Sequence, residues 1–146
     1  MTPPLPVLRV AEPPPQYLQR PPIVVDCSAL AGVLFQEPWR HDAQTRLSGR
    51  SLYAPFILQV EICSVALKKT RQGAAMAATE GLAQWQDFDI ELVRIDIAET
   101  FALSERYQLS AYDAAYLWLA ADLKCPLATF DAKLAAAAQS HLSSLL

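Results

Sequence analysis

The chain has 146 residues and a formal net charge of −3, and 53% of its residues are hydrophobic. This length suffices for one domain with its own core. No apolar run approaches the roughly 20 residues that span a bilayer, and the N-terminus lacks the basic start and apolar block of a signal peptide. We therefore expect a soluble, cytoplasmic protein with no membrane contact.

Residues 1–22 are rich in proline, which fixes the backbone φ angle and removes a hydrogen-bond donor. We expect this segment to be an extended or disordered arm. The folded domain is then expected to span residues 23–146.

From residue 23 onward, short apolar segments alternate with helical patterns. Expected strands are 23–26, 52–54, 90–93 and 127–129, with 142–146 as a last edge strand. Expected helices are 29–35, 38–47, 56–72, 74–86, 97–107, 111–123 and 132–138. This alternation predicts an α/β fold with a parallel sheet covered on both faces.

Four acidic residues stand at the edge or in the middle of apolar stretches: Asp26, Glu61, Asp113 and Asp131. A carboxylate in apolar surroundings needs a partner, a shifted pKa or a bound cation. Asp26 ends one expected strand and Asp131 lies just past another, and parallel sheets bind ligands beyond the carboxyl ends of their strands. Because Mg²⁺ and Mn²⁺ prefer carboxylate oxygens, these acids predict a divalent-metal site.

Each acid also has a purely structural interpretation. Asp113 follows Ser110 in the pattern of a capping box, and Asp26 and Asp131 fit helix N-caps. Glu61 has the weakest such alternative, because it falls within the apolar stripe expected for helix 56–72. That stripe consists of Ile57, Val60, Glu61, Ser64 and Val65.

Polar and basic residues near the acids extend the hypothesis. Ser28 and Thr129 could orient the metal ligands or a metal-bound water. Lys68, Lys69 and Arg71 lie downstream of Glu61 and could bind the phosphate backbone of a nucleic acid despite the negative net charge. The alternative for these cations is an ordinary solvated surface.

Four segments together resemble the PIN-domain family, and within it the VapC-type toxins of prokaryotic toxin–antitoxin pairs. They are Val24–Leu30, Val60–Ile62, Tyr112–Ala120 and Thr129–Leu134. The resemblance implies a three-layer α/β/α fold with a central, mostly parallel sheet of four to five strands. It also implies an Mg²⁺- or Mn²⁺-dependent endoribonuclease that leaves a 5′ phosphate at the cut.

In this resemblance the four acids bind the metal, and Ser28 and Thr129 support them. Its implied partners are an RNA substrate and a VapB-like antitoxin. Five aromatic residues further predict a homodimer with an apolar groove for an antitoxin segment, with core packing as the alternative. These residues are Trp39, Tyr53, Phe56, Trp85 and Phe88.

Two other functions remain open at the level of sequence. A catalytically silent PIN-like module would keep the fold and bind a partner. A phosphatase of the haloacid dehalogenase type would use Asp-x-Asp after the first strand, but Ser28 occupies the second of those positions.

Overall fold

The computed structural model describes residues 4, 6, 8, 9, 11 and 20–145. Most of the predicted N-terminal arm therefore lies outside the described residues. Pairing with the sheet begins just before the predicted domain start, since the Pro21 carbonyl accepts a hydrogen bond from the Ser51 N–H at 3.1 Å.

The described residues form four strands and seven helices. The strands are β1 (Pro22–Val25), β2 (Ser51–Pro55), β3 (Ile90–Val93) and β4 (Leu127–Ala128). The helices are α2 (Cys27–Leu34), α3 (Arg40–Leu47), α4 (Ile57–Arg71), α5 (Ala75–Trp85), α6 (Ile97–Tyr107), α7 (Ala111–Leu123) and α8 (Ala132–Ser143). Of these described helices, none is long and apolar enough to cross a membrane.

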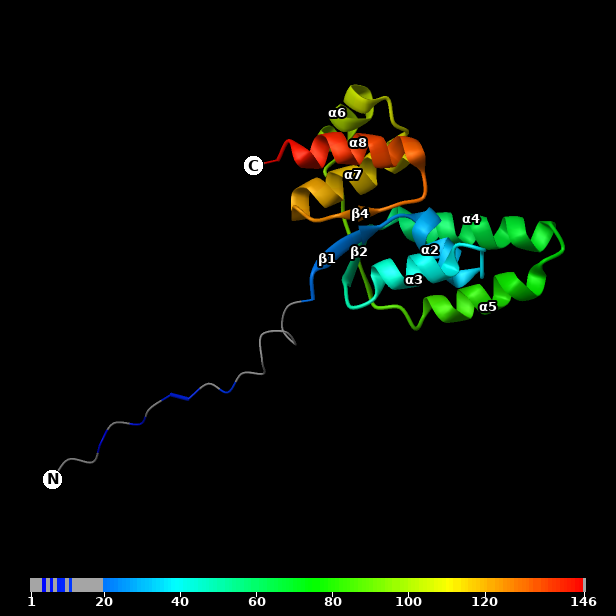
Figure 1. Ribbon diagram of the computed structural model, residues 1–146, viewed down its shortest axis with the longest axis horizontal. Coiled ribbons are helices and arrows are strands. Elements are labelled where there is room, and N and C mark those ends of the chain that lie inside the picture. The colour runs from blue at the N-terminus through cyan, green and yellow to red at the C-terminus, as the bar shows by residue number, and fades with distance from the viewer. Residues whose placement is uncertain (1–3, 5, 7, 10, 12–19, 146) are drawn as a thin grey trace.

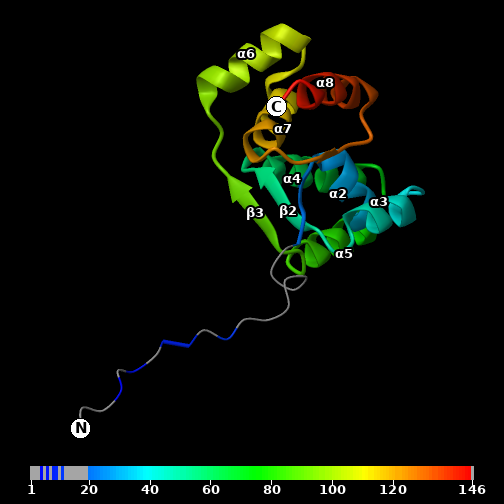
Figure 2. The same cartoon turned by 60° about the vertical axis from the view of Figure 1, so that its left-hand side comes forward.

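The strands form one parallel sheet in the order β3-β2-β1-β4. Helices α2 to α5 gather on one side of it and α6 to α8 on the other (Figures 1 and 2). Val24 and Val25 in β1 are fully buried, as expected for a central strand covered on both faces. The predicted α/β fold with a parallel sheet between helical layers is confirmed.

The register of the sheet places two loop segments side by side. Val25 pairs with Ala128 across β1 and β4. Because the strands are parallel, Asp26 and Thr129 leave the sheet at the same edge. This pairing brings together residues that lie about a hundred positions apart in the sequence.

The predicted edge strand at 142–146 is wrong for the residues that the structure describes. Helix α8 continues to Ser143 instead, and Leu146 lies outside the described residues. Leu134, Ala138 and Leu142 recur every fourth position and pack on the core, so the helical pattern simply continues.

The apolar stripe predicted for α4 is displaced by about one residue. The buried side chains of this helix are Leu58, Ile62 and Ala66, whereas Val60 is 63% exposed. Ser64 is exposed as well. Glu61 therefore lies at the border of the buried face, half-buried, and can reach both protein and solvent.

Two of the five aromatic residues behind the predicted homodimer are exposed, and the homodimer itself stays a prediction. Tyr53, Trp85 and Phe88 pack against the core, so the core-packing alternative holds for these three. Trp39 and Phe56 remain exposed, at 42% and 51%. The exposed aromatic surface is thus smaller than the sequence argument assumed.

Candidate active site

Asp26 is a buried acid at the carboxyl end of β1, with 5% of its surface exposed. It caps α2: its Oδ1 accepts hydrogen bonds from the Ala29 N–H at 3.0 Å and the Ser28 hydroxyl at 2.7 Å. The Thr129 hydroxyl donates to the other carboxylate oxygen. The N-cap is therefore Asp26, as its structural interpretation predicted, and both of its oxygens are fixed in place.

Ser28 and Thr129 also hold the loop that carries Asp131. The Phe130 N–H donates to the Ser28 hydroxyl at 2.8 Å, and the Asp131 N–H donates to the Thr129 hydroxyl at 2.9 Å. Asp131 caps α8 by accepting from the Leu134 N–H at 2.8 Å. The capping interpretation of Asp131 is confirmed, and the same network sets the loop beside Asp26.

Asp113 and Glu61 approach the site from α7 and α4. The Asp113 N–H donates to the Ser110 hydroxyl at 3.1 Å, as the capping-box pattern predicts. Glu61 accepts a hydrogen bond of 2.6 Å from the Tyr116 hydroxyl. Tyr116 is 1% exposed and was not recognised from the sequence as a site residue. The sequence feature that could have identified Tyr116 is its position three residues after Asp113, which places both residues on the same helix face.

Burial and mutual repulsion raise the pKa values of three of these acids. Burial is the largest cause for each pKa. The negative charge of Asp131 further raises the pKa values of Asp26 and Asp113. Asp26 and Asp113 in turn raise the pKa of Glu61. Asp26 and Asp113 therefore each interact electrostatically with the other three acids.

Little positive charge offsets this cluster. Within the described ranges the ion pairs are Arg46–Asp42 and Lys69–Glu37, and neither includes one of the four acids. Lys133 lowers the pKa of Asp113 slightly, as the smallest of five influences. Burial and the neighbouring Glu61 and Asp26 raise the pKa of the Cys27 thiol to about 12, so it stays protonated at neutral pH.

The comparisons with known proteins agree on one family. The sequence profile of the PIN domain matches residues 23–139. The chain belongs to the PIN domain family. Its relatives include a VapC ribonuclease from Mycobacterium bovis and Ribonuclease VapC9 from Mycobacterium tuberculosis. Each is 32% identical over 126 residues, covering 82% of this chain and 93% of the relative.

A solved structure supports the fold independently. PAE2754 from Pyrobaculum aerophilum superposes with a TM-score of 0.65 at 21% sequence identity. The match covers 86% of this chain and 96% of that protein. The PIN architecture expected from the sequence motifs is therefore the one observed.

The acids of this PIN domain do not form a closed metal cage. Across residues 20–145 and the described arm positions, no group of three His, Cys, Asp or Glu side chains is arranged to hold an ion. Mg²⁺ is usually bound through one or two carboxylates and keeps several waters. The oxygen-only donor set and the unbalanced negative charge fit this open mode of binding.

The predicted RNA-binding cluster lies at the far end of α4. Lys68, Lys69 and Arg71 occupy its last turn, and Lys69 pairs with Glu37. Lys68 follows Glu61 by seven residues, or roughly 10 Å along a helix axis. Their role in RNA binding stays a prediction.

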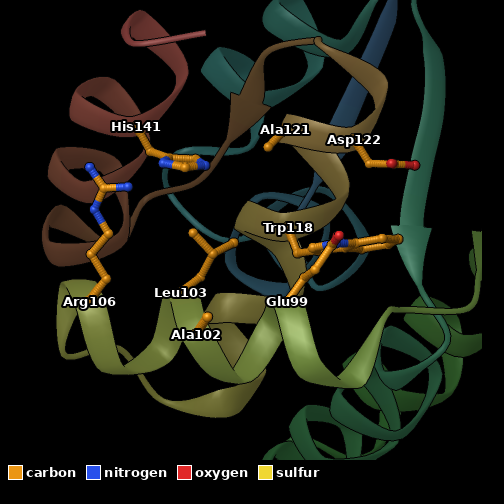
Figure 3. Close-up of a pocket in the computed structure, with 8 residues that line it drawn as sticks. All are labelled: Glu99, Ala102, Leu103, Arg106, Trp118, Ala121, Asp122 and His141. Atoms are coloured by element: carbon orange, nitrogen blue, oxygen red, sulfur yellow. The ribbon is translucent and has the colours of Figure 1, made fainter.

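A separate cavity lies between α6, α7 and α8, with a volume of about 360 Å³ (Figure 3). The lining includes Glu99, Arg106, Asp122, His141 and Trp118, and none of the four acids. The Trp118 indole N–H donates to Glu99 at 2.6 Å, which fixes one wall of the cavity. This cavity of the PIN domain is distinct from the acidic cluster.

The Tyr116→Phe substitution tests the contact that holds Glu61. Because the hydrogen bond from Tyr116 lowers the pKa of Glu61, its removal is expected to raise that pKa further. The free energy of unfolding should fall by about 1–3 kcal/mol. Carboxyl NMR titration and urea unfolding measure both effects. Tyr112→Phe is the control, because Tyr112 lies on the same helix but is 57% exposed, and it should change neither quantity. If the pKa of Glu61 in Tyr116→Phe equalled that of the wild type, the hydrogen bond between Tyr116 and Glu61 would be contradicted.

Proposed function

We propose that this PIN domain is a divalent-metal-dependent endoribonuclease and the toxin of a toxin–antitoxin pair. The observation that carries the proposal is the cluster of acids at the ends of β1 and β4. Three of its members have pKa values raised by burial and by each other, without an ion-pair partner among the described residues. The two mycobacterial relatives named as VapC ribonucleases support the substrate class.

In this proposal Asp26, Glu61, Asp113 and Asp131 hold one or two Mg²⁺ or Mn²⁺ ions. Such an ion, when bound, activates water for attack on phosphorus and neutralises charge on the phosphoryl oxygens. The raised pKa values fit this role, because a divalent cation would favour the ionised form of each carboxylate.

The neighbouring polar groups position these acids. Ser28 and Thr129 donate to opposite oxygens of Asp26, which fixes the plane of its carboxylate. Tyr116 donates to one oxygen of Glu61 from α7. Hydrogen bonds of this kind around metal ligands typically affect metal affinity or activity about 10- to 100-fold.

The ends of the RNA fragments test this mechanism. Attack by water with departure of the 3′ oxygen is expected to give fragments with a 5′ phosphate and a 3′ hydroxyl. Ligation of the fragments, which requires a 5′ phosphate, measures this outcome. Fragments with a 5′ hydroxyl and a cyclic phosphate would indicate attack by the ribose 2′ hydroxyl and contradict the proposal.

The same proposal includes a homodimer and a VapB-like antitoxin as partners. An apolar groove of about 410 Å³ lies beside the acidic cluster, where Tyr112 directly precedes Asp113. Phe56, Ile97 and Tyr112 line it and are 51%, 81% and 57% exposed. Exposed apolar surface of this kind typically marks a protein interface. A basic side chain of a bound antitoxin could then compete with the metal for the carboxylates.

The Ile97→Asp substitution is expected to weaken the dimer about 30-fold or more, as for a central interface residue. A charge placed in the apolar groove would lose its hydration on association. Sedimentation velocity over a range of protein concentrations measures the change. Met76→Asp is the matched control, since Met76 is 76% exposed on α5 and outside the groove. A wild-type protein that remains monomeric would exclude the homodimer.

A further inference from the structure

A second groove, of about 720 Å³, lies between α3 and the edge strand β4 and reaches the acidic cluster. Its lining includes Ala29 and Thr129. Both residues also hydrogen-bond to the carboxylate of Asp26, through the Ala29 N–H and the Thr129 hydroxyl. The groove and the cluster therefore share a wall, and a chain lying in the groove would pass beside the acids.

One exposed aromatic ring lines this groove, and a second packs against the first. Phe130 lines it, between Thr129 and Asp131, and its ring centroid lies 5.8 Å from that of Trp39. The two rings are tilted by 52° to each other. Trp39 is 42% exposed and Phe130 is 43% exposed. Each ring thus keeps a substantial area open to solvent, and Phe130 directly precedes Asp131 in the chain.

Trp39 is held in place although it is exposed. Its indole lies against α2 at Gly32, where an added Cβ would stand 2.4 Å from the indole nitrogen. Only a residue without a side chain permits this approach. The ring is therefore positioned before any ligand arrives, which reduces the entropy lost on binding.

The groove also carries positive charge. Arg46 and Arg50 line it from α3 and the turn that follows. Arg46 pairs with Asp42 at 3.4 Å, but the two side chains are 74% and 57% exposed, so the pair is weak. A phosphate could replace Asp42, since arginine binds phosphate through paired hydrogen bonds.

We infer that Trp39 and Phe130 stack an unpaired base beside the scissile phosphate, while Arg46 and Arg50 bind the backbone of adjoining nucleotides. Bases in a duplex are already stacked on each other, so this surface selects single-stranded RNA. The inference rests on the proposed function and assigns the residues that bind its RNA substrate. It also places RNA binding in the groove beside β4 rather than at the basic end of α4.

RNA binding in EDTA tests the aromatic pair without any cleavage. Fluorescence anisotropy with a short fluorescein-labelled oligoadenylate is expected to show affinity about 5- to 100-fold weaker for Trp39→Leu and Phe130→Leu. Phe130→Tyr keeps an aromatic face and should bind like the wild type. Phe101→Leu, an aromatic residue 61% exposed on α6, is the control and should also bind normally.

Gly32→Ala tests the position of the indole without removing it. The added methyl group should displace Trp39 and weaken oligoadenylate binding as Trp39→Leu does. In the Trp39→Leu background, Gly32→Ala should cause no further loss of binding, because the indole that the added methyl group would displace is absent. Circular dichroism on every variant separates lost binding from lost folding.

Charge variants compare the two candidate RNA surfaces. Arg46→Gln with Arg50→Gln should weaken binding and reduce the salt dependence, by about 0.7 in the logarithmic slope for each phosphate that the protein no longer neutralises. Lys68→Gln with Arg71→Gln should have little effect. The inference is overturned if folded Trp39→Leu and Phe130→Leu bind oligoadenylate as tightly as the wild type. It is also overturned if RNA duplex binds as well as the single strand.

These outcomes separate the inference from the proposed function. Aromatic-dependent binding without metal-dependent cleavage would overturn the nuclease and leave the binding surface intact. Cleavage of RNA that is unaffected by the Leu substitutions would overturn the surface and leave the nuclease.

Discussion

Asp113→Asn is expected to reduce RNA cleavage by at least about a hundredfold while the protein stays folded. Residues that merely support metal ligands already affect activity about 10- to 100-fold, so loss of a ligand should exceed that range. Ser110 caps α7 by accepting a hydrogen bond from the backbone N–H of Asp113, and this bond survives the substitution. Cleavage rate with Mn²⁺ and urea unfolding without metal measure the two parts of this prediction.

Asp122→Asn is the matched control for this variant. Asp122 lies on the same helix, is exposed and lines the separate cavity shown in Figure 3. Its substitution should leave cleavage unchanged. If Asp113→Asn cut RNA at the wild-type rate, its metal role would be wrong, and if it unfolded, capping would be its main role.

We also expect the stability of the metal-free protein to fall as the pH rises from about 4 toward neutrality. The folded-state pKa values of Asp26, Glu61 and Asp113 are raised, so the folded protein binds more protons than the unfolded chain. Their contribution to stability is full below the unfolded-state pKa of about 4. It is lost as the pH rises through the raised folded-state values. Bound metal should reverse this loss, adding about 2.7 kcal/mol at a hundredfold excess over its dissociation constant.

The comparison of wild type with Asp113→Asn isolates this effect from other titrating groups. The variant should have the same stability as the wild type near pH 4 and become the more stable of the two toward pH 7. Addition of Mn²⁺ should then favour the wild type. Urea unfolding across this pH range measures the difference, and a variant equally destabilised at every pH would argue that Asp113 is not repelled by its neighbours.

Much of the fold could be predicted from local pattern. The strand Ile90–Val93 and the helix Ile97–Tyr107 were predicted with the bounds observed, because their apolar periodicity and flanking residues are clear. The predicted strand at 142–146 was wrong because Leu142 extends the apolar spacing of α8. Short apolar ends of this kind fit either a strand or a helix until the packing is known.

The grouping of Asp26 with Asp131 and its contacts with Ser28 and Thr129 could be anticipated from the sequence, but the contacts of Tyr116 and Trp39 could not. Asp26 and Asp131 were placed together because parallel strands end at one edge of a sheet. The contact of Tyr116 with Glu61 joins α7 to α4 across 55 sequence positions, and no local pattern encodes it. The pairing of Trp39 with Phe130 depends likewise on how the loop after β4 folds over α2.

A helix-capping role and the proposed metal binding are not mutually exclusive. Asp26 and Asp131 both cap helices, as their structural alternatives predicted. Each uses Oδ1 to accept the capping N–H, and Asp26 also accepts from Thr129 with Oδ2. A capping role therefore does not by itself exclude an acid from the proposed metal site.

Cleavage of a labelled single-stranded RNA, with Mn²⁺ and after its removal by EDTA, tests the central claim most directly. The proposed mechanism predicts cleavage by the wild type with Mn²⁺, none in EDTA, and recovery when excess Mn²⁺ is restored. Asp113→Asn should stay inactive throughout. Cleavage that persists in EDTA, or that Asp113→Asn retains at the wild-type rate, would contradict a metal-dependent nuclease built on these acids.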